Sequence, residues 1–158
     1  MNALIKSATI VNSKSPFNGK TVDILIEKGI IKKIAANIKN TDNFQEIKQK
    51  DLHVSIGWFD FRANFCDPGF EYKEDLNSGL KAAAKGGFTG VMVMPSTNPV
   101  IDNKSGIEYI INKAKNNIVN VFPAGSLTHQ SEGNDIAEMY DMHLAGAVAF
   151  TDNKKSIA

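Results

Sequence analysis

The sequence of 158 residues lacks the features that mark several protein classes. A single cysteine, Cys66, excludes an internal disulfide. No apolar run approaches the roughly 20 residues of a membrane-spanning helix. The formal net charge of +1 gives no basis for binding nucleic acid. Because Lys6 comes early and only short apolar runs follow it, the N-terminus does not resemble a signal peptide. We therefore expect a cytoplasmic protein without nucleic-acid or membrane partners.

Short alternating segments dominate the first 54 residues. Apolar alternation predicts four strands, over residues 3–12, 21–26, 30–34 and 51–54. The polar segment 37–50 predicts a loop with a short extended piece. We interpret residues 1–54 as a small antiparallel β domain, a β-sandwich that flanks the rest of the chain.

From residue 55 to residue 158 the chain alternates apolar runs with amphipathic segments. The apolar runs predict four strands, at residues 56–61, 88–94, 118–125 and 146–150. The segments between them predict three helices, over residues 73–85, 102–115 and 131–145. Repeated β–α units of this kind are typical of a parallel sheet or a (β/α)8 TIM barrel, which needs eight strands. Four units form the first half of such a barrel, so we expect the remaining half on another chain or lost by cleavage.

One stretch, residues 56–75, joins an apolar strand to an acidic helix start and reads I-G-W-F-D-F-R-A-N-F-C-D-P-G-F-E-Y-K-E-D. It resembles the first-strand signature of the dihydroorotases, G-x-x-D-x-H-x-H-x-R-D-P-G. The dihydroorotases are metal-dependent cyclic amidohydrolases. Gly57, Asp60 and the D-P-G of residues 67–69 match this signature. The resemblance implies an amidohydrolase-type TIM barrel preceded by a flanking β domain.

The positions that carry the chemistry of the signature are changed here. Arg62 and Asn64 stand where the family has its two metal-binding histidines, and Cys66 stands in place of the arginine that holds the substrate carboxylate. Residues 62, 64 and 66 alternate, so a strand would project them to one face. An arginine cannot act as a zinc ligand, and a neutral asparagine is a poor one. We predict that Arg62 fills the metal pocket and pairs with Asp152.

Two later segments also resemble the family. M-P-S-T-N-P at residues 94–99 is similar to M-P-N-T-x-P, in which the asparagine contacts substrate; Ser96 replaces it here. F-T-D-N at residues 150–153 is similar to F-S/T-D-D-G, in which an aspartate can bind metal. Asp152 keeps one acid and Asn153 replaces the other, and the sequence leaves open which position is the ligand. Asp152 is a candidate metal ligand, with a loop or capping role as the alternative.

Two functions are compatible with these residues. One is an active dihydroorotase of pyrimidine biosynthesis that uses zinc and is completed by residues outside this chain. The other is a catalytically degenerate homologue without a cofactor, for which the resemblance implies aspartate transcarbamoylase or self-association as the partner. Hydrolysis of a cyclic amide needs a metal-activated hydroxide, and His53, His129 and His143 do not restore the H-x-H spacing. The changes at the four positions Arg62, Asn64, Cys66 and Ser96 therefore favour the degenerate homologue.

Overall fold

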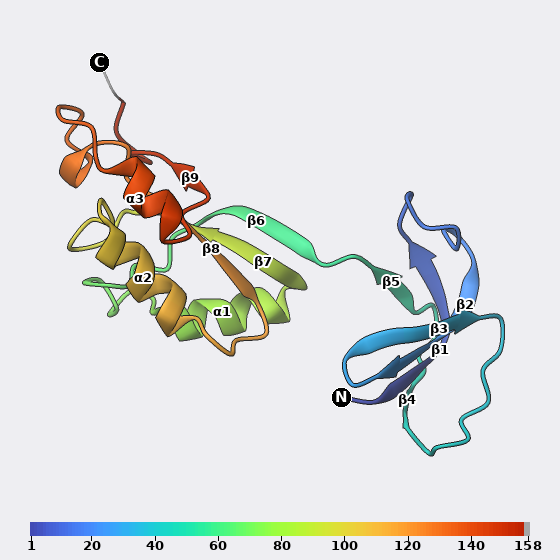
Figure 1. Cartoon of the computed structure of the whole chain (residues 1–158). Helices are drawn as coiled ribbons and strands as arrows, with labels where there is room; N and C mark the ends of the chain where they lie inside the picture. Colours follow the sequence, from blue (N-terminus) through green and yellow to red (C-terminus); the bar gives the residue numbers. More distant parts are fainter. Residues whose placement is uncertain (157–158) are drawn as a thin grey trace. The chain divides into compact units, whose positions relative to one another are not determined.

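The computed structural model describes residues 1–156, and the chain divides into two compact units with their boundary between Ile56 and Gly57. Each unit has its own β-sheet (Figure 1). Among residues 1–156, the longest helices have 10 residues, and none is both long and apolar enough to cross a membrane.

The first unit is a single mixed sheet of five strands. These are β1 (Ala3–Val11), β2 (Thr21–Glu27), β3 (Ile30–Ala35), β4 (Gln45–Ile47) and β5 (His53–Ser55). Strands β1, β2 and β3 pair antiparallel through short connections, whereas β4 and β5 pair parallel to β1. The expectation of a purely antiparallel domain is therefore wrong, and residues 1–56 hold one sheet rather than the two layers of a sandwich.

A buried carboxylate, Asp23 on β2, ties this sheet to the segment that follows β3. Its side chain accepts hydrogen bonds from Lys6 Nζ at 2.5 Å and from the backbone amides of Ser7 and Ile38 at 2.9 and 2.8 Å. Burial by itself raises the pKa of Asp23, but these donors outweigh it and hold the pKa below its ordinary value. The charged form is thus the one that the fold stabilises.

Within residues 57–156, the second unit contains four parallel strands and three α-helices. The strands are β6 (Trp58–Ala63), β7 (Phe88–Val93), β8 (Asn120–Gly125) and β9 (Ala149–Phe150), hydrogen-bonded in that order. The helices are α1 (Leu76–Lys85), α2 (Lys104–Lys113) and α3 (Met139–Leu144). All three helices lie on one face of the sheet (Figure 1). This arrangement is a partial barrel, as the strand–helix rhythm predicts.

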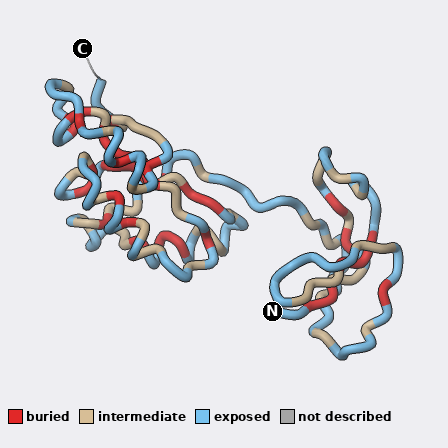
Figure 2. Tube along the Cα trace, in the orientation of Figure 1, coloured by how far each residue is buried: buried red, intermediate tan, exposed pale blue. Residues whose placement is uncertain are grey.

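The core of this unit lies between the sheet and its helices (Figure 2). Leu76 and Leu80 of α1 pack against Val91 and Val93 of β7, and a second cluster joins α2 to α3. The opposite face of the sheet carries three contacting aromatic rings, those of Phe59, Phe61 and Phe122. Phe61 is 71% exposed, so this face is apolar and lacks a cover within the described chain.

Side-chain caps account for two of the helices. Asp75 accepts hydrogen bonds from the amides of Asn77 and Ser78 at the start of α1, and Asn103 caps α2. The third helix begins at Met139 rather than at the predicted residue 131. A short 3-10 turn (η1, His129–Ser131) and Gly133, at φ +81°, precede it, and the backbone there cannot continue a helix.

Candidate functional site

Four polar side chains from three strand ends form one hydrogen-bonded group, here named the strand-end cluster: Arg62, Asn64, Ser96 and Asn153. Arg62 lies on β6, while the other three follow the carboxyl ends of β6, β7 and β9. The carboxyl ends of parallel strands share one edge of a sheet, which is why residues far apart in sequence meet here. This edge is where barrel enzymes hold their catalytic groups.

Asn153 is the centre of the cluster. Its side-chain oxygen accepts hydrogen bonds from Arg62 Nε at 3.1 Å and from Arg62 Nη2 at 2.9 Å. Its side-chain nitrogen donates to Ser96 Oγ at 2.7 Å and to Asn64 Oδ1 at 3.3 Å. Arg62 and Asn64 therefore reach the same side of the strand end, as their alternation predicts. One amide side chain links the other three members of the cluster.

The predicted pair between Arg62 and Asp152 is wrong. Asp152 is 4% exposed and turns toward the loop after β8. Its Oδ1 accepts from Ser126 Oγ and from the amides of Leu127 and Thr128 at 2.8–3.0 Å, and its Oδ2 accepts from Thr128 Oγ1 at 2.6 Å. Burial raises the pKa of Asp152, but these donors together lower it below its ordinary value. Asp152 thus acts as a loop clasp, the alternative role considered for it.

Cys66 lies outside the strand-end cluster. Strand β6 ends at Ala63, so the alternation that would align residue 66 with residues 62 and 64 does not extend to it. The Cys66 backbone has a φ of +58°, and its thiol approaches the Asn64 carbonyl at 3.6 Å. The chain turns away from the strand direction at this residue, and Cys66 is half-buried in the turn.

The D-P-G turn anchors the loop after β6 to α2. Asp67 is fully buried and accepts hydrogen bonds from Tyr109 and Lys113 of α2, each at 2.8 Å, and from the Leu76 amide at 3.0 Å. Burial raises the pKa of Asp67, but the bonds from Lys113, Leu76 and Tyr109 outweigh it, so the pKa is lowered. The same bond to Asp67 raises the pKa of Lys113. This aspartate is structural, because all its acceptor capacity faces the fold.

Gly69 shows why the turn needs glycine. Its φ is +93°, and a Cβ there would lie 1.9 Å from the backbone oxygen of Asn98. The two loops are further joined by a hydrogen bond from the Asn98 amide to the Pro68 carbonyl at 3.0 Å. The loop after β6 and the loop that carries Ser96 therefore hold each other in place.

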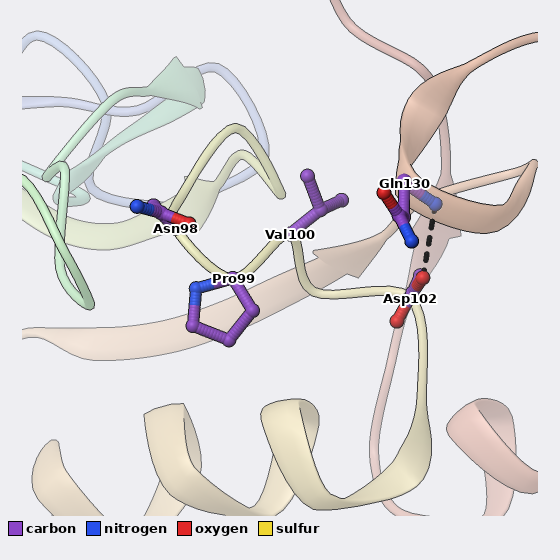
Figure 3. A pocket seen from close by; sticks show the side chains of 5 residues that line it. All are labelled: Asn98, Pro99, Val100, Asp102 and Gln130. Atoms are coloured by element: carbon purple, nitrogen blue, oxygen red, sulfur yellow. Dashed lines mark hydrogen bonds between the residues drawn. The ribbon is translucent and has the colours of Figure 1, made fainter.

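Two hollows lie near these loops. One, of about 400 Å³, is lined by the polar residues Arg62 and Asn153 and by apolar residues that include Phe61, Met92, Met94 and Phe150. The other, also about 400 Å³, lies between Asn98, Pro99, Val100, Asp102 and Gln130 (Figure 3). There the Gln130 amide donates to Asp102 Oδ2 at 2.9 Å, and His129 lies 3.5 Å from the same oxygen. Only the first hollow includes members of the strand-end cluster.

The strand-end cluster does not fit a zinc ion. Zinc binds thiolate, imidazole and carboxylate groups, whereas the cluster offers a guanidinium, two amides and a hydroxyl. Within residues 1–156, no three His, Cys, Asp or Glu side chains lie close enough together to hold a metal. That positions 62 and 64 do not serve as metal ligands stays a prediction. Sequence reasoning missed the role of Asn153, and its place after F-T-D in a motif with two acids is the only signal for it.

Comparisons with known proteins agree on one family. A family model described as dihydro-orotase-like matches residues 53–158. A protein named dihydroorotase from Ruminiclostridium cellulolyticum is 40% identical over 99% of this chain and 36% of its own length. Another from Geobacter sulfurreducens is 41% identical over 99% of this chain and 37% of its own length. The chain thus spans little more than a third of the relatives that it matches.

Solved structures give the same fold. An L-hydantoinase (dihydropyrimidinase) from Arthrobacter aurescens matches 94% of this chain and 32% of its own, with a TM-score of 0.70 and 21% identity. A dihydroorotase crystal structure matches 94% of this chain and 41% of its own, with a TM-score of 0.64 and 16% identity. At these identities the likeness concerns the fold alone.

Proposed function

The chain belongs to the dihydro-orotase-like family, and from this premise we propose that it is a catalytically degenerate dihydroorotase homologue associated with pyrimidine biosynthesis. The strand-end cluster carries this proposal. The positions that the family pattern assigns to metal and substrate hold a guanidinium, two amides and a hydroxyl that hydrogen-bond one another. Such a cluster provides neither metal ligands nor a general base.

The chemistry of the reaction explains why this matters. Opening a cyclic amide at neutral pH requires a hydroxide, and a bound metal supplies it by lowering the pKa of water. A positive guanidinium at the metal position repels a cation instead of binding it. Neither Asn64 nor Asn153 can take up a proton near neutral pH. The residues present therefore support binding or structural roles rather than hydrolysis.

A second candidate function is an active dihydroorotase completed by residues outside this chain. The identity of about 40% to proteins named dihydroorotase favours it. It requires zinc, with ligands contributed by strands that follow β9 in the barrel. Asp152 would then have to give up its bonds to Ser126 and Thr128 to reach a metal.

Two measurements on the purified chain, alone and together with the remaining half of the barrel, separate these functions. They are metal analysis and a dihydroorotate hydrolysis assay. We expect no stoichiometric zinc and no turnover. The double variant Arg62→His, Asn64→His should bind zinc more tightly, because it adds two imidazole ligands. Loss of an outer-shell partner alone changes metal affinity roughly 10- to 100-fold, and a direct ligand matters at least as much. It should gain zinc before it gains turnover, since Cys66→Arg and Ser96→Asn would still be needed to hold the substrate.

The matched control is Arg62→Lys, Asn64→Gln, which alters the same positions without adding imidazole. Its zinc affinity should equal that of the unchanged chain. Stoichiometric zinc with clear turnover in the unchanged chain would place the active enzyme first.

A partner for the sheet is part of the same proposal. Phe61 is 71% and Phe59 is 38% exposed on the face opposite the helices, and β6 and β9 are edge strands of the four-stranded sheet. Exposed parallel edges and an apolar face favour covering by the remaining half of a barrel. Aspartate transcarbamoylase, or self-association, follows only by analogy with the family.

A further inference from the structure

We propose that the strand-end cluster is an anion site that binds a small organic carboxylate through Arg62. This inference rests on the proposed loss of the metal site and extends it: the changed residues reverse the charge preference of the site. A metal site surrounds a cation with electron-pair donors. The strand-end cluster instead directs N–H and O–H groups at the same edge of the sheet.

The guanidinium of Arg62 is held in one orientation, with three of its five N–H donors free of hydrogen-bond partners within residues 1–156. Nε and one hydrogen of Nη2 are used by the Asn153 side-chain oxygen, at 3.1 and 2.9 Å. The other edge of the fork, Nη1 with the second hydrogen of Nη2, has no hydrogen-bond partner within residues 1–156. Two parallel N–H groups on a planar fork match the two oxygens of a carboxylate. Asn153 thus orients the arginine without neutralising it.

No acidic side chain balances this charge in the part of the chain that the structure describes. The ion pairs there involve Lys6, Lys104, Lys113 and His129, and none includes Arg62. The acid next to the cluster, Asp152, has both oxygens occupied by the loop after β8. Asp60 accepts a hydrogen bond only from the Arg62 backbone amide, at 2.8 Å. The guanidinium is therefore held in place by Asn153, and its positive charge is not balanced by a neighbouring carboxylate.

The composition of the chain supports a specific role for the fork. Arg62 is the only arginine among 18 basic residues, and all the others are lysines. A lysine would supply the same charge, but as a point charge without a planar pair of donors. The single arginine of this chain thus lies in the strand-end cluster, where its planar pair of donors can be used.

The hollow beside Arg62 indicates the class of ligand. It has a volume of about 400 Å³ and is lined by Arg62 together with apolar residues that include Phe61, Met92 and Phe150. A ligand that matches both kinds of lining has a carboxylate and an apolar or planar body. Benzoate has this form, and benzamide is its neutral counterpart of nearly equal shape.

A titration followed by NMR tests the proposal on the whole chain. Because Arg62 is the only arginine, its Nε–H gives a single guanidinium signal that needs no further assignment. At constant ionic strength and mildly acidic pH, benzoate should shift this signal saturably, and benzamide should not. An unsaturable shift, or an equal shift with benzamide, would overturn the proposal.

Three variants complete the test. Asn153→Asp keeps the shape of the cluster and the Arg62 signal but supplies an internal carboxylate, so benzoate binding should be lost. Arg62→Lys removes the Nε–H signal, so this variant is followed through the side-chain NH2 signals of Asn153, and its binding should be roughly 10-fold weaker or more, because the bidentate fork is lost. The control Lys154→Gln removes an exposed positive charge near the cluster in sequence and should leave the affinity within about twofold.

Binding by Asn153→Asp as strong as that of the unchanged chain would contradict the proposal. The anion site and the proposed loss of catalysis fail on different measurements. Zinc and turnover in the unchanged chain would refute the degenerate function, whereas a silent Arg62 signal would refute the anion site alone.

Discussion

Breaking the bond between Asp67 and Lys113 should release the loop after β6. The carboxylate is fully buried, and the Lys113 side chain is 31% exposed, with 2.8 Å between them. Removing one partner of a buried pair costs about 3–5 kcal/mol. In the variant Asp67→Asn the new amide oxygen can still accept from Leu76 or Tyr109, and water reaches Lys113, so we expect about 2–3 kcal/mol.

Hydrogen exchange at the Leu76 amide measures this cost locally, because that amide donates to Asp67 at 3.0 Å. A loss of about 2–3 kcal/mol corresponds to exchange roughly 30- to 150-fold faster in Asp67→Asn at neutral pH. Lys113→Met should produce a comparable effect. Lys115→Met, two residues later and exposed, is the matched control and should change the rate less than about threefold.

If the Leu76 amide in Asp67→Asn exchanges within about threefold of its rate in the unchanged chain, the Asp67–Lys113 bond does not hold the loop after β6. The same conclusion would follow if Lys115→Met and Lys113→Met had equal effects. A double variant, Asp67→Asn with Lys113→Met, should cost less than the sum of the two single changes, because neither change then leaves a charged partner behind.

Two further outcomes follow from the buried acids. The pKa of Asp67 is lowered below its ordinary value of 3.8, so the stability that this carboxylate contributes is complete above pH 3.8 and is lost as the pH falls through the folded-state pKa. The protection of the Leu76 amide against exchange, corrected for intrinsic exchange, should therefore fall in this acidic range in the unchanged chain. In Asp67→Asn it should stay constant over the same range. Asp152→Asn should place an amide donor against the Thr128 hydroxyl and lower the protection of the Thr128 amide against exchange by about 1–3 kcal/mol. The exposed control Asp141→Asn should leave the protection of this amide unchanged. Equal protection in both variants would refute the role of Asp152 in holding the loop after β8.

Most of the second unit could be predicted from local patterns. The apolar runs at residues 88–94 and 118–125 correspond to β7 and β8 within two residues at each end. A capping residue locates α2, because Asn103 bonds a free amide at the start of the helix. The first helix is predicted from residue 73, whereas α1 starts at Leu76 with Asp75 as its cap. The prediction for the third helix is too long because it gives the apolar spacing from Ile136 to Met139 more weight than Gly133, whose positive φ ends any helix there.

Three members of the strand-end cluster could be predicted, but its centre, Asn153, and its bonds could not. The spacing of Arg62 and Asn64 indicates a shared face, and the motif comparison identifies Ser96. Which of Asp152 and Asn153 turns toward them depends on the backbone after β9, a strand of only two residues. Alternation over so short a strand does not define a face, so the partner of Arg62 had to come from the three-dimensional arrangement.

The hub position of Asn153 has a consequence for how this protein can evolve. Four of the positions that differ from the family pattern now bond one another through the same amide. Restoring a single histidine at residue 62 removes two bonds to Asn153 without completing a ligand set, and restoring an acid at residue 153 creates an ion pair with Arg62 rather than a metal site. Each of these two changes loses contacts within the cluster before any ion can compensate. The four side chains are therefore coupled, so the effect of changing one of them depends on the other three.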